Sequence, residues 1–299
     1  MKPVCTIEDL PTLPAEVKLG VVGNPIAHSL SPPMQQAALD AAGLPYSYIR
    51  LLSGREDGEF ETLIQALIRA GFAGVNVTVP FKKRAYALAD AADALSTLCG
   101  AANTLVFQGG RVSCYNTDGP GFERAVQELC GRRPAELSIV LLGACGGAGV
   151  AVAAQCVLSG CRQLTLVNRP RPELESLAEL LRPRSAGRVD TSYFSAAELP
   201  DVVAQADLIV NATSLGLAEG DALPLPPELL CEGQVVYDLI THPTALQRAA
   251  AERGCLVSGG QSMLLWQGAY AFERWFGSMP DAAAMHRALT AASAALRAH

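Results

Sequence analysis

The segment from residue 137 to residue 158 constrains the fold of this chain more than any other part of it. Residues 137–142 form an apolar run with the length of a buried strand, and residues 150–158 have the composition of an apolar helix. Four glycines lie between them, in the stretch Gly143-Ala-Cys-Gly-Gly-Ala-Gly149. A strand, a glycine-rich turn and a helix form a phosphate-binding unit, because a diphosphate can approach the N–H groups at the helix N-terminus. A tight turn without a ligand is the alternative.

The end of the next strand indicates which cofactor such a unit would bind. Residues 164–167 are strand-like and are followed by Asn168-Arg-Pro-Arg171, with no carboxylate before Glu173. An acid here would bind the ribose 2′-hydroxyl of NAD, whereas an arginine suits the 2′-phosphate of NADP because its planar fork donates two hydrogen bonds. The sequence therefore favours NADP over NAD, and solvated arginines are the alternative.

Strands alternate with helices in the first part of the chain, which is typical of a mainly parallel α/β sheet. Ser31, as an N-cap, and Pro32, at the first helical position, indicate the start of a helix. A hairpin is expected where two strand-like runs flank Gln108-Gly-Gly110. We expect strands at residues 18–23, 46–52, 74–79, 104–107 and 111–115, and helices at residues 32–42, 60–70, 83–92 and 122–130.

The alternation restarts at residue 137, and a length of 299 residues suits two domains. Asn211-Ala-Thr-Ser-Leu-Gly216 follows a strand of this second part, where small polar residues can line the nicotinamide side of a cofactor site. The C-terminal region, residues 263–297, is helical by its periodicity. Further strands are expected at residues 207–210, 234–238 and 256–257.

Lys82 lies at the end of the stretch Asn76-Val-Thr-Val-Pro-Phe-Lys82. Pro80 cannot donate to a sheet ladder and therefore ends the strand that precedes it. Lys82 is expected at or just beyond this strand end, which is where α/β enzymes place reactive groups. Taken alone, a lysine at such a position is more often solvated than catalytic.

Charge and composition argue against several classes of protein. The formal net charge is −6 and the basic residues are scattered, which disfavours a nucleic-acid surface. We find no run of 18 apolar residues and no signal-peptide pattern in residues 1–16, so neither a membrane span nor secretion is expected. The nine cysteines include no Cys-x-x-Cys pair and the four histidines are dispersed. We therefore expect no metal site, and free thiols in a reducing cytoplasm.

Five motifs in a fixed order resemble the shikimate/quinate dehydrogenase family, and the match extends over about Leu19 to Gly277. The glycine-rich turn, Asn168-Arg169 and Asn211-Ala-Thr-Ser214 fit the same family. The five motifs are Gly23-Asn-Pro-Ile-Ala-His-Ser-Leu-Ser-Pro32, Asn76-Val-Thr-Val-Pro-Phe-Lys82, Gly100-Ala-Ala-Asn-Thr104, Asn116-Thr-Asp-Gly-Pro-Gly121 and Ser262-Met-Leu-Leu-Trp-Gln267.

The resemblance implies an N-terminal α/β substrate domain and a Rossmann-type NADP-binding domain, with C-terminal helices that return to the first domain. The substrate domain would comprise residues 1–117 and 261–299, and the dinucleotide domain residues 118–260. The implied activity is the reversible reduction of 3-dehydroshikimate to shikimate in the chorismate pathway of aromatic amino acid biosynthesis. The resemblance also implies a small-molecule substrate, no nucleic acid or membrane partner, a cytoplasmic location and a monomer or homodimer.

The same resemblance assigns site residues by motif. Lys82 and Asp118 would be the catalytic pair, since a lysine beside an aspartate can donate a proton to the reacting oxygen or take it back. Substrate-binding residues would be Ser29, Ser31, Thr78, Asn103, Gln267 and Thr241, with the two serines on the carboxylate. Cofactor-binding residues would be Gly143, Ala144, Gly146, Gly147, Ala148, Asn168, Arg169, Arg171, Thr213, Ser214 and Gly260.

Three departures from the family pattern keep alternatives open. Cys145 lengthens the glycine-rich turn by one residue, Pro170 replaces a usual threonine, and Thr241 stands where the family often has a substrate-contacting tyrosine. The nearest alternative is a quinate/shikimate dehydrogenase paralogue that uses NAD or NADP. A non-catalytic sensor of a cyclitol acid is an alternative of another class, which the intact Lys82 and Asp118 disfavour.

Overall fold

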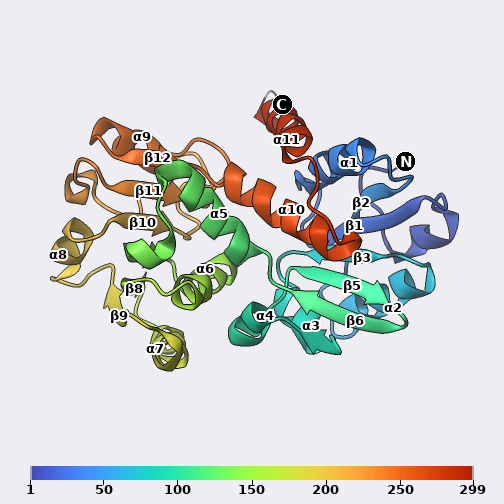
Figure 1. Ribbon diagram of the computed structural model, residues 1–299, viewed down its shortest axis with the longest axis horizontal. Coiled ribbons are helices and arrows are strands. Elements are labelled where there is room, and N and C mark those ends of the chain that lie inside the picture. The colour runs from blue at the N-terminus through green and yellow to red at the C-terminus, as the bar shows by residue number, and fades with distance from the viewer. Residues whose placement is uncertain (1, 298–299) are drawn as a thin grey trace. The chain divides into compact units, whose positions relative to one another are not determined.

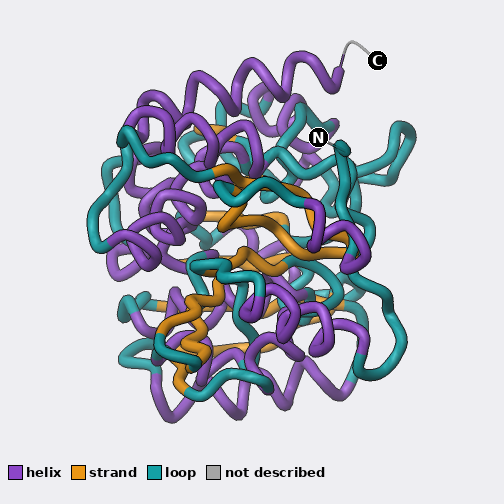
Figure 2. The backbone as a smooth tube through the Cα atoms, turned by 90° about the vertical axis from the view of Figure 1, so that its right-hand side faces the viewer, coloured by secondary structure: helices purple, strands orange, loops and turns teal. Residues whose placement is uncertain are grey.

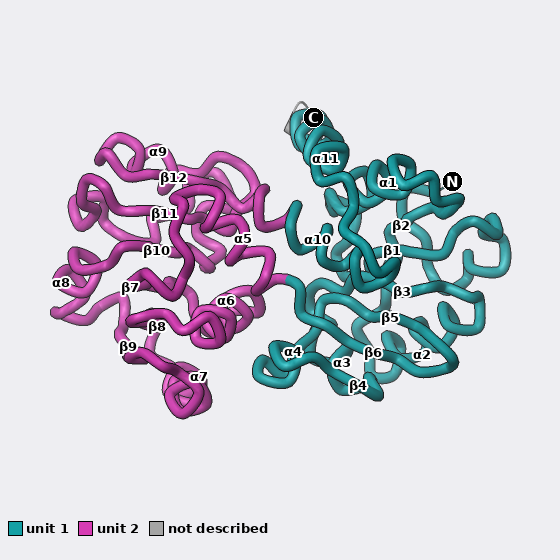
Figure 3. The backbone as a smooth tube through the Cα atoms, viewed as in Figure 1, with its two compact units in different colours: residues 1–117, 265–299 teal, residues 118–264 magenta. Residues whose placement is uncertain are grey.

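The computed structural model describes residues 2–297, which form two compact units (Figure 3). Unit 1 comprises residues 1–117 and 265–299, and unit 2 comprises residues 118–264. The second boundary lies inside helix α10 (Gln261–Phe276), whereas the sequence indicated a boundary after residue 260. Figure 2 marks the helices, strands and loops along the described backbone. Among the described residues, no helix is both long and apolar enough to cross a membrane.

Within the described residues, unit 1 contains a six-stranded mixed sheet in the order β2-β1-β3-β5-β6-β4 (Figure 1). Strand β1 pairs in parallel with both β2 and β3, and β3, β5 and β6 pair antiparallel. The hairpin expected around Gly109 and Gly110 is present, and both glycines have positive φ. The strands are β1 (Val17–Gly23), β2 (Ser47–Leu52), β3 (Gly74–Val77), β4 (Ala91–Ala92), β5 (Thr104–Gln108) and β6 (Arg111–Tyr115).

Helices cover both faces of this sheet. Buried residues of α2 and α3 pack with Val75 and Val77 on one face. On the other face, α10 lies close to β3 and β5, since the Trp275 indole donates a hydrogen bond to the Leu105 carbonyl at 3.0 Å. The helices are α1 (Ser31–Ala41), α2 (Glu59–Arg69), α3 (Lys82–Ala87), α4 (Ala94–Cys99), α10 and α11 (Ala282–Arg297), with a 3-10 helix at Ile7–Thr12.

Unit 2 has, within the described chain, a six-stranded parallel sheet in the order β12-β11-β10-β7-β8-β9. Numbered along the chain from β7 and read from the β9 edge, this is the order 3-2-1-4-5-6 of a Rossmann fold, so the expected fold class is confirmed. The apolar runs form buried strands because helices lie on both faces of a parallel sheet. The strands are β7 (Ser138–Leu142), β8 (Gln163–Asn168), β9 (Arg188–Tyr193), β10 (Leu208–Asn211), β11 (Val235–Asp238) and β12 (Leu256–Ser258).

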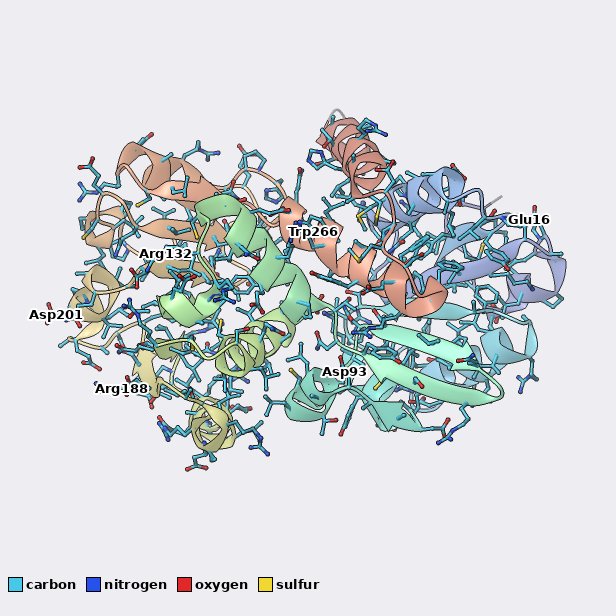
Figure 4. The ribbon with its side chains drawn as sticks, in the orientation of Figure 1. Glu16, Asp93, Arg132, Arg188, Asp201 and Trp266 are labelled. Atoms are coloured by element: carbon cyan, nitrogen blue, oxygen red, sulfur yellow. The ribbon has the colours of Figure 1, made fainter. Side chains whose placement is uncertain are left out.

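Successive side chains of β11 point to opposite faces of the unit 2 sheet. Val236 packs in a cluster with α8 and α9, whereas the next residue, Tyr237, meets Phe122 of α5 edge to face at 5.6 Å. Arg132, labelled in Figure 4, lies just after α5 and donates a hydrogen bond to Asp207, which precedes β10. The helices are α5 (Asp118–Cys130), α6 (Gly147–Leu158), α7 (Pro172–Leu181), α8 (Leu199–Ala204) and α9 (Ala245–Glu252), with 3-10 helices at Pro134–Glu136, Arg182–Arg184 and Pro227–Leu229.

Several expected elements differ in the structure. The helix expected at residues 83–92 ends at Ala87, because Asp90 exchanges hydrogen bonds with Val112 and draws the chain into the sheet as β4. The C-terminal region is two helices, interrupted at Gly277, which has positive φ, and Pro280. No element was predicted for residues 172–204, which contain α7, β9 and α8.

Two helix starts were also misplaced. Ser31 is not an N-cap but the first residue of α1, and its N–H donates to the Ser29 hydroxyl at 3.3 Å. Helix α5 begins at Asp118, four residues earlier than the expected start at Phe122. Both differences concern candidate site residues, so the local geometry of the site was not predicted by helix signals alone.

Candidate active site

The carboxyl ends of β1 and β3 lie next to each other in unit 1, and both lead into candidate site residues. The two loops are joined by backbone hydrogen bonds from Thr78 to Val22 (2.9 Å) and from Asn24 to Val79 (3.1 Å). Gly23 has to be a glycine here, since a Cβ at this position would lie 2.5 Å from the Thr78 side chain. The loop after β1 is thereby held beside Thr78, which is only partly buried.

The loop after β1 presents Ser29 and Ser31 together. The Ser29 hydroxyl accepts from the Ser31 N–H, and the Arg50 guanidinium donates from Nε and Nη2 to the Ser29 carbonyl at 3.2 and 2.7 Å. Burial lowers the pKa of Arg50, which nevertheless stays charged at neutral pH. Sequence reasoning missed Arg50, because a charged residue inside a strand carries no signal of the loop that it will contact.

Lys82 begins α3, directly after the strand end, and its backbone is held from two sides. Its carbonyl accepts a hydrogen bond from the Ala102 N–H at 2.9 Å. The preceding residue, Phe81, is buried and stacks on Phe60 with ring centroids 4.9 Å apart. One turn further, Arg84 forms a two-pronged ion pair with Glu61 and lies over both phenyl rings. Packing and charge therefore fix the helix that carries Lys82.

Asn103 and Gln267 meet inside unit 1. Gln267 follows Trp266, which is labelled on α10 in Figure 4, and the Asn103 amide Nδ2 donates to Gln267 Oε1 at 3.4 Å. The Asn103 amide cannot turn over, because its Oδ1 already accepts from the Thr117 N–H at 2.8 Å and from the hydroxyls of Thr104 and Thr117 at 3.1 Å. Asn103 therefore points its NH₂ group away from this cluster.

A second buried layer supports Asn103. Asn76 donates to the Asn103 carbonyl and to the Thr104 hydroxyl at 3.2 and 3.0 Å. The Tyr48 hydroxyl donates in turn to Asn76 Oδ1 at 2.7 Å, and burial raises the pKa of Tyr48. This connected network fixes both amides. A flipped Asn103 would turn its NH₂ group toward the Thr117 N–H, and a flipped Asn76 would turn its oxygen toward the Asn103 carbonyl.

Asp118 comes directly after Thr117, whose N–H binds Asn103, and is the first residue of α5 in unit 2. Its side chain is buried. A carboxylate in the first turn of a helix is stabilised by the unpaired N–H groups and the positive end of the helix dipole. The position of Asp118 is thus fixed by Thr117, which is bound to Asn103, on one side and by the first turn of α5 on the other.

The glycine-rich turn of unit 2 fits a diphosphate. Gly143 has φ of 78°, and a Cβ there would lie 2.8 Å from the Thr213 nitrogen. A Cβ at Gly149 would lie 2.5 Å from the Gly143 carbonyl oxygen, so these two glycines allow the turn to pack against its surroundings. At Gly147, the first residue of α6, a Cβ would meet nothing within 4 Å. The exposed Gly146 and Gly147 thus leave the helix N-terminus open to an anion, with Ala144 buried and Ala148 partly buried beside them.

The two candidate arginines after β8 have different surroundings. Asn168 is buried, and its side-chain oxygen accepts from the Arg169 N–H at 2.9 Å. Arg169 is exposed. Arg171 donates from Nε and Nη2 to the Glu173 carboxylate at 3.0 and 3.2 Å, and this hydrogen bonding raises the pKa of Arg171. Arg169 is therefore the better placed of the two to accept a phosphate.

Thr213 is fixed by hydrogen bonds to other residues of its own turn, which follows β10. Its hydroxyl donates to Asn211 Oδ1 at 2.7 Å and accepts from the Leu215 N–H, while its own N–H also binds Asn211 Oδ1. Ser214 is exposed. Gly260 is buried against the chain after β11, since a Cβ there would lie 2.1 Å from the Leu239 carbonyl oxygen.

A fully buried carboxylate, Asp238, lies beneath this turn and was not predicted. Its Oδ1 accepts from Asn211 Nδ2 at 3.0 Å and from the Ile240 N–H at 3.1 Å. Its Oδ2 accepts from the Thr244 hydroxyl at 2.6 Å and from Gln247 Nε2 at 3.4 Å. Thr244 is also the N-cap of α9, so Asp238 connects the turn after β10 to the loop that carries the partly buried Thr241.

Among residues 2–297, no group of three or more His, Cys, Asp or Glu side chains could hold a metal ion. The candidate substrate and catalytic groups of unit 1 are a lysine, hydroxyls and amides, and Asp118 is the first residue of unit 2.

Comparison with known proteins gives consistent matches over nearly the whole chain. Residues 21–105 match a family model described as the shikimate dehydrogenase substrate binding domain, and residues 260–290 match one described as the shikimate 5'-dehydrogenase C-terminal domain. A relative from Rubrobacter xylanophilus, named shikimate dehydrogenase (NADP(+)), is 41% identical over 286 residues, which is 94% of this chain and 98% of the relative.

Two solved structures share the fold. Shikimate 5-dehydrogenase from Thermus thermophilus, in complex with NADP(H) and shikimate, is 35% identical with a TM-score of 0.81, over 92% of this chain and 99% of that one. Quinate dehydrogenase from Corynebacterium glutamicum, in complex with NAD, is 30% identical with a TM-score of 0.84, over the same shares of the two chains.

Proposed function

The chain belongs to the shikimate dehydrogenase family, and we propose that it catalyses the reversible NADPH-dependent reduction of 3-dehydroshikimate to shikimate. The observation that carries this proposal is the arrangement in unit 1, where Ser29, Thr78 and Lys82 follow two adjacent strands and Asn103 pairs with Gln267. Each of these groups has a function in binding or reducing a polyhydroxylated keto acid.

The reduction needs a hydride at the ketone carbon and a proton at its oxygen. When bound, NADPH supplies the hydride. Lys82 is assigned the proton transfer, because its ammonium group can stabilise the negative charge that develops on the oxygen and can then donate a proton to it. Asp118 is assigned the role of holding the ammonium group of Lys82 in place. In the oxidative direction, Lys82 takes the proton back from the substrate hydroxyl.

The substrate carboxylate is assigned to the hydroxyls of Ser29 and Ser31. Arg50 of β2 adds a positive charge beside this loop, since it binds the Ser29 carbonyl. The ring hydroxyls are assigned to Thr78 and to the amide groups of Asn103 and Gln267. Fixed amides suit this purpose because a hydroxyl left unpaired in a buried pocket costs about 1–3 kcal/mol.

NADP is assigned to the glycine-rich turn of unit 2, with Gly143, Ala144, Gly146, Gly147 and Ala148 around the diphosphate. Asn168, Arg169 and Arg171 are assigned to the adenosine ribose and its 2′-phosphate, and Thr213, Ser214 and Gly260 to the nicotinamide side. Among the two arginines, the exposed Arg169 carries the preference for NADP, because Arg171 is already paired with Glu173.

Mutation of Lys82 tests the catalytic assignment. We expect Lys82→Ala to lower turnover by about 10²–10⁴-fold, as for loss of a general acid, while substrate affinity stays within several-fold. Lys83→Ala is the matched control, since Lys83 is the exposed neighbour on the same helix and should leave turnover unchanged. Unchanged turnover in Lys82→Ala would refute the assignment of proton transfer to this lysine.

Mutation of Arg169 tests the cofactor assignment. We expect Arg169→Ala to raise the KM for NADP much more than the KM for NAD, because NAD lacks the 2′-phosphate. Arg188→Ala is the control, since Arg188 starts β9 at the opposite end of the sheet and pairs with Asp190. Equal effects of Arg169→Ala on both cofactors would refute its role at the 2′-phosphate.

A quinate/shikimate dehydrogenase activity is the second candidate, and Thr241 is the observation that favours it. A threonine in place of a tyrosine leaves more room near the acid-bearing carbon, where quinate carries an additional hydroxyl. Initial rates with shikimate and quinate, each with NADP and NAD, separate the two activities. A higher kcat/KM for quinate than for shikimate would replace the leading assignment.

We further propose a cytoplasmic enzyme that is a monomer or a homodimer. Support for a reducing compartment comes from thiols such as Cys156, which is fully buried among apolar residues and whose pKa is raised by that burial. Cell fractionation tests the location, and light scattering of the purified protein tests the oligomeric state.

A further inference from the structure

Cys231 and Cys255 lie side by side at the amino end of the unit 2 sheet. Cys231 lies in the loop before β11, and Cys255 directly precedes β12. The two segments are joined by backbone hydrogen bonds from Gly233 to Gly254 at 3.1 Å and from Leu256 to Gln234 at 2.8 Å. The ladder between β11 and β12 thus continues to within two residues of Cys231.

The sulfur of Cys255 is directed at Cys231. Its Sγ lies 3.4 Å from the Cys231 carbonyl oxygen, and the Cys231 Sγ lies 3.9 Å from the Leu229 carbonyl. Cys231 is exposed and Cys255 is partly buried. The backbone segments of the two cysteines are already joined by the ladder. A rotation about the Cα–Cβ bond of Cys231 is therefore the movement that would bring its sulfur toward the sulfur of Cys255.

The surroundings favour reaction at Cys231. The Arg253 guanidinium donates from Nε and Nη2 to the carbonyl of Leu230, the residue before Cys231, at 3.1 Å each. Cys231 is exposed, so a peroxide in solution can reach its sulfur, which reacts as the thiolate. Burial raises the pKa of Cys255 and the neighbouring Cys231 adds to this effect, while Arg253 offsets part of it. The exposed thiol is therefore the nucleophile and the more buried one reacts second.

We propose that Cys231 and Cys255 are a reversible thiol–disulfide modification site that is oxidised by peroxides. The Cys231 thiolate attacks a peroxide oxygen, so that an S–O bond forms, the O–O bond breaks and hydroxide leaves when the oxidant is hydrogen peroxide. The Cys255 sulfur then attacks the Cys231 sulfur, the S–O bond breaks, and water leaves with the proton of the Cys255 thiol. Two thiols are oxidised to one disulfide, and one hydrogen peroxide is reduced to two waters.

The disulfide would enclose residues 231–255, which contain β11 and α9. It lies at the amino end of these parallel strands, whereas the glycine-rich turn follows the carboxyl end of β7. Oxidation is therefore expected to stabilise unit 2 against unfolding without blocking the proposed cofactor site, because a cross-link lowers the entropy of the unfolded chain. The function of the pair is protection of the thiols and of the fold under oxidative conditions.

The experiment treats the full-length protein with a small excess of hydrogen peroxide, alkylates the remaining thiols and maps peptides by mass spectrometry. We expect the thiol count to fall by two, a peptide cross-linked between Cys231 and Cys255, and full reversal by dithiothreitol. Activity should stay within about twofold of the reduced enzyme. In Cys255→Ser, Cys231 should proceed to the sulfinic acid or to a mixed disulfide, because the second thiol is missing.

Cys130→Ser is the matched control, since Cys130 is also partly buried and lies on α5. This variant should form the same cross-link as the wild type. Nine unmodified thiols after treatment, a sulfinic acid at Cys231 in the wild type, or a disulfide between other cysteines would each overturn the proposal. If Cys231→Ser and Cys255→Ser fail to fold, the wild-type peptide map still decides between these outcomes.

Discussion

Replacement of Asp238 by asparagine tests whether a buried carboxylate positions the cofactor turn. Asp238 is fully buried, and each of its oxygens accepts two hydrogen bonds. An asparagine has the same shape but must present an NH₂ group in place of one oxygen. An NH₂ group in place of Oδ1 faces the N–H donors of Asn211 and Ile240. In place of Oδ2 it faces the Gln247 amide and forces the Thr244 hydroxyl to turn its proton away.

The expected cost follows from this geometry. A buried donor that loses its acceptor costs about 1–3 kcal/mol, so two such donors would cost about 2–6 kcal/mol. Loss of a buried charge offsets part of this, because an ionised carboxylate is itself costly to bury. We therefore expect Asp238→Asn to lower the free energy of unfolding by about 2–4 kcal/mol.

The effect should reach the cofactor through Asn211. Its Nδ2 binds Asp238, which leaves Oδ1 to accept from the N–H and hydroxyl of Thr213. If the Asn211 amide turns over to meet the new NH₂ group, Thr213 loses both bonds and the turn loosens. We expect the KM for NADP to rise about tenfold, while the KM for shikimate changes less.

Denaturant unfolding and initial-rate kinetics at saturating concentrations of the second substrate measure these two effects. Asp201→Asn is the control for loss of a carboxylate, since Asp201 is exposed on α8 and labelled in Figure 4. Thr244→Ser, which keeps a hydroxyl for Asp238, should retain most of the affinity for NADP. An unfolding free energy within about 1 kcal/mol of the wild type and an unchanged KM for NADP would refute the positioning role of Asp238.

Three further predictions concern other parts of the chain. Arg50→Met should raise the KM for shikimate about tenfold with little change in kcat, because it removes a charge beside Ser29 that acts on binding; initial rates would contradict this if only kcat fell. Gly149→Ala should abolish measurable NADP binding or prevent folding, because its Cβ would lie 2.5 Å from a carbonyl oxygen; calorimetric titration with NADP checks this. Although burial raises the pKa of Asp207, hydrogen bonds from the Ser138 N–H and the Arg132 guanidinium outweigh it and hold the pKa below its usual value. The stability difference between wild type and Asp207→Asn should therefore be fully present above about pH 4 and disappear as the pH falls through the folded-state pKa, and a constant difference down to about pH 2 would contradict this.

The dinucleotide-binding fold could be predicted because its signals are local. A buried strand, the turn from Gly143 to Gly149 and an apolar helix follow one another directly in the chain, so no distant residue is needed to recognise them. The strand order of unit 2 agrees with this prediction. The motifs around Lys82 and Asp118 were likewise readable as short segments, and the roles assigned to these two residues are predictions for the mutations above.

Other features depend on partners far away in the chain. Residues 91–92 were expected in a helix, but Asp90 binds Val112 and the chain joins the sheet instead. Arg50 shows the same limit, because it contacts Ser29 only once β1 and β2 are paired. Helical periodicity and charge describe a segment by itself and carry no information about such contacts.

The sequence by itself determined the class of the fold, the alternation of strands and helices, and which residue types stand at the strand ends. The tertiary structure alone decided how these groups are oriented. The Asn103 amide is turned by hydrogen bonds from Thr104 and Thr117, and Asp238 is buried beneath Thr213 through Asn211. The physical reason is that hydrophobic patterns repeat along the chain, whereas a buried polar group finds its partners only when separate strands meet.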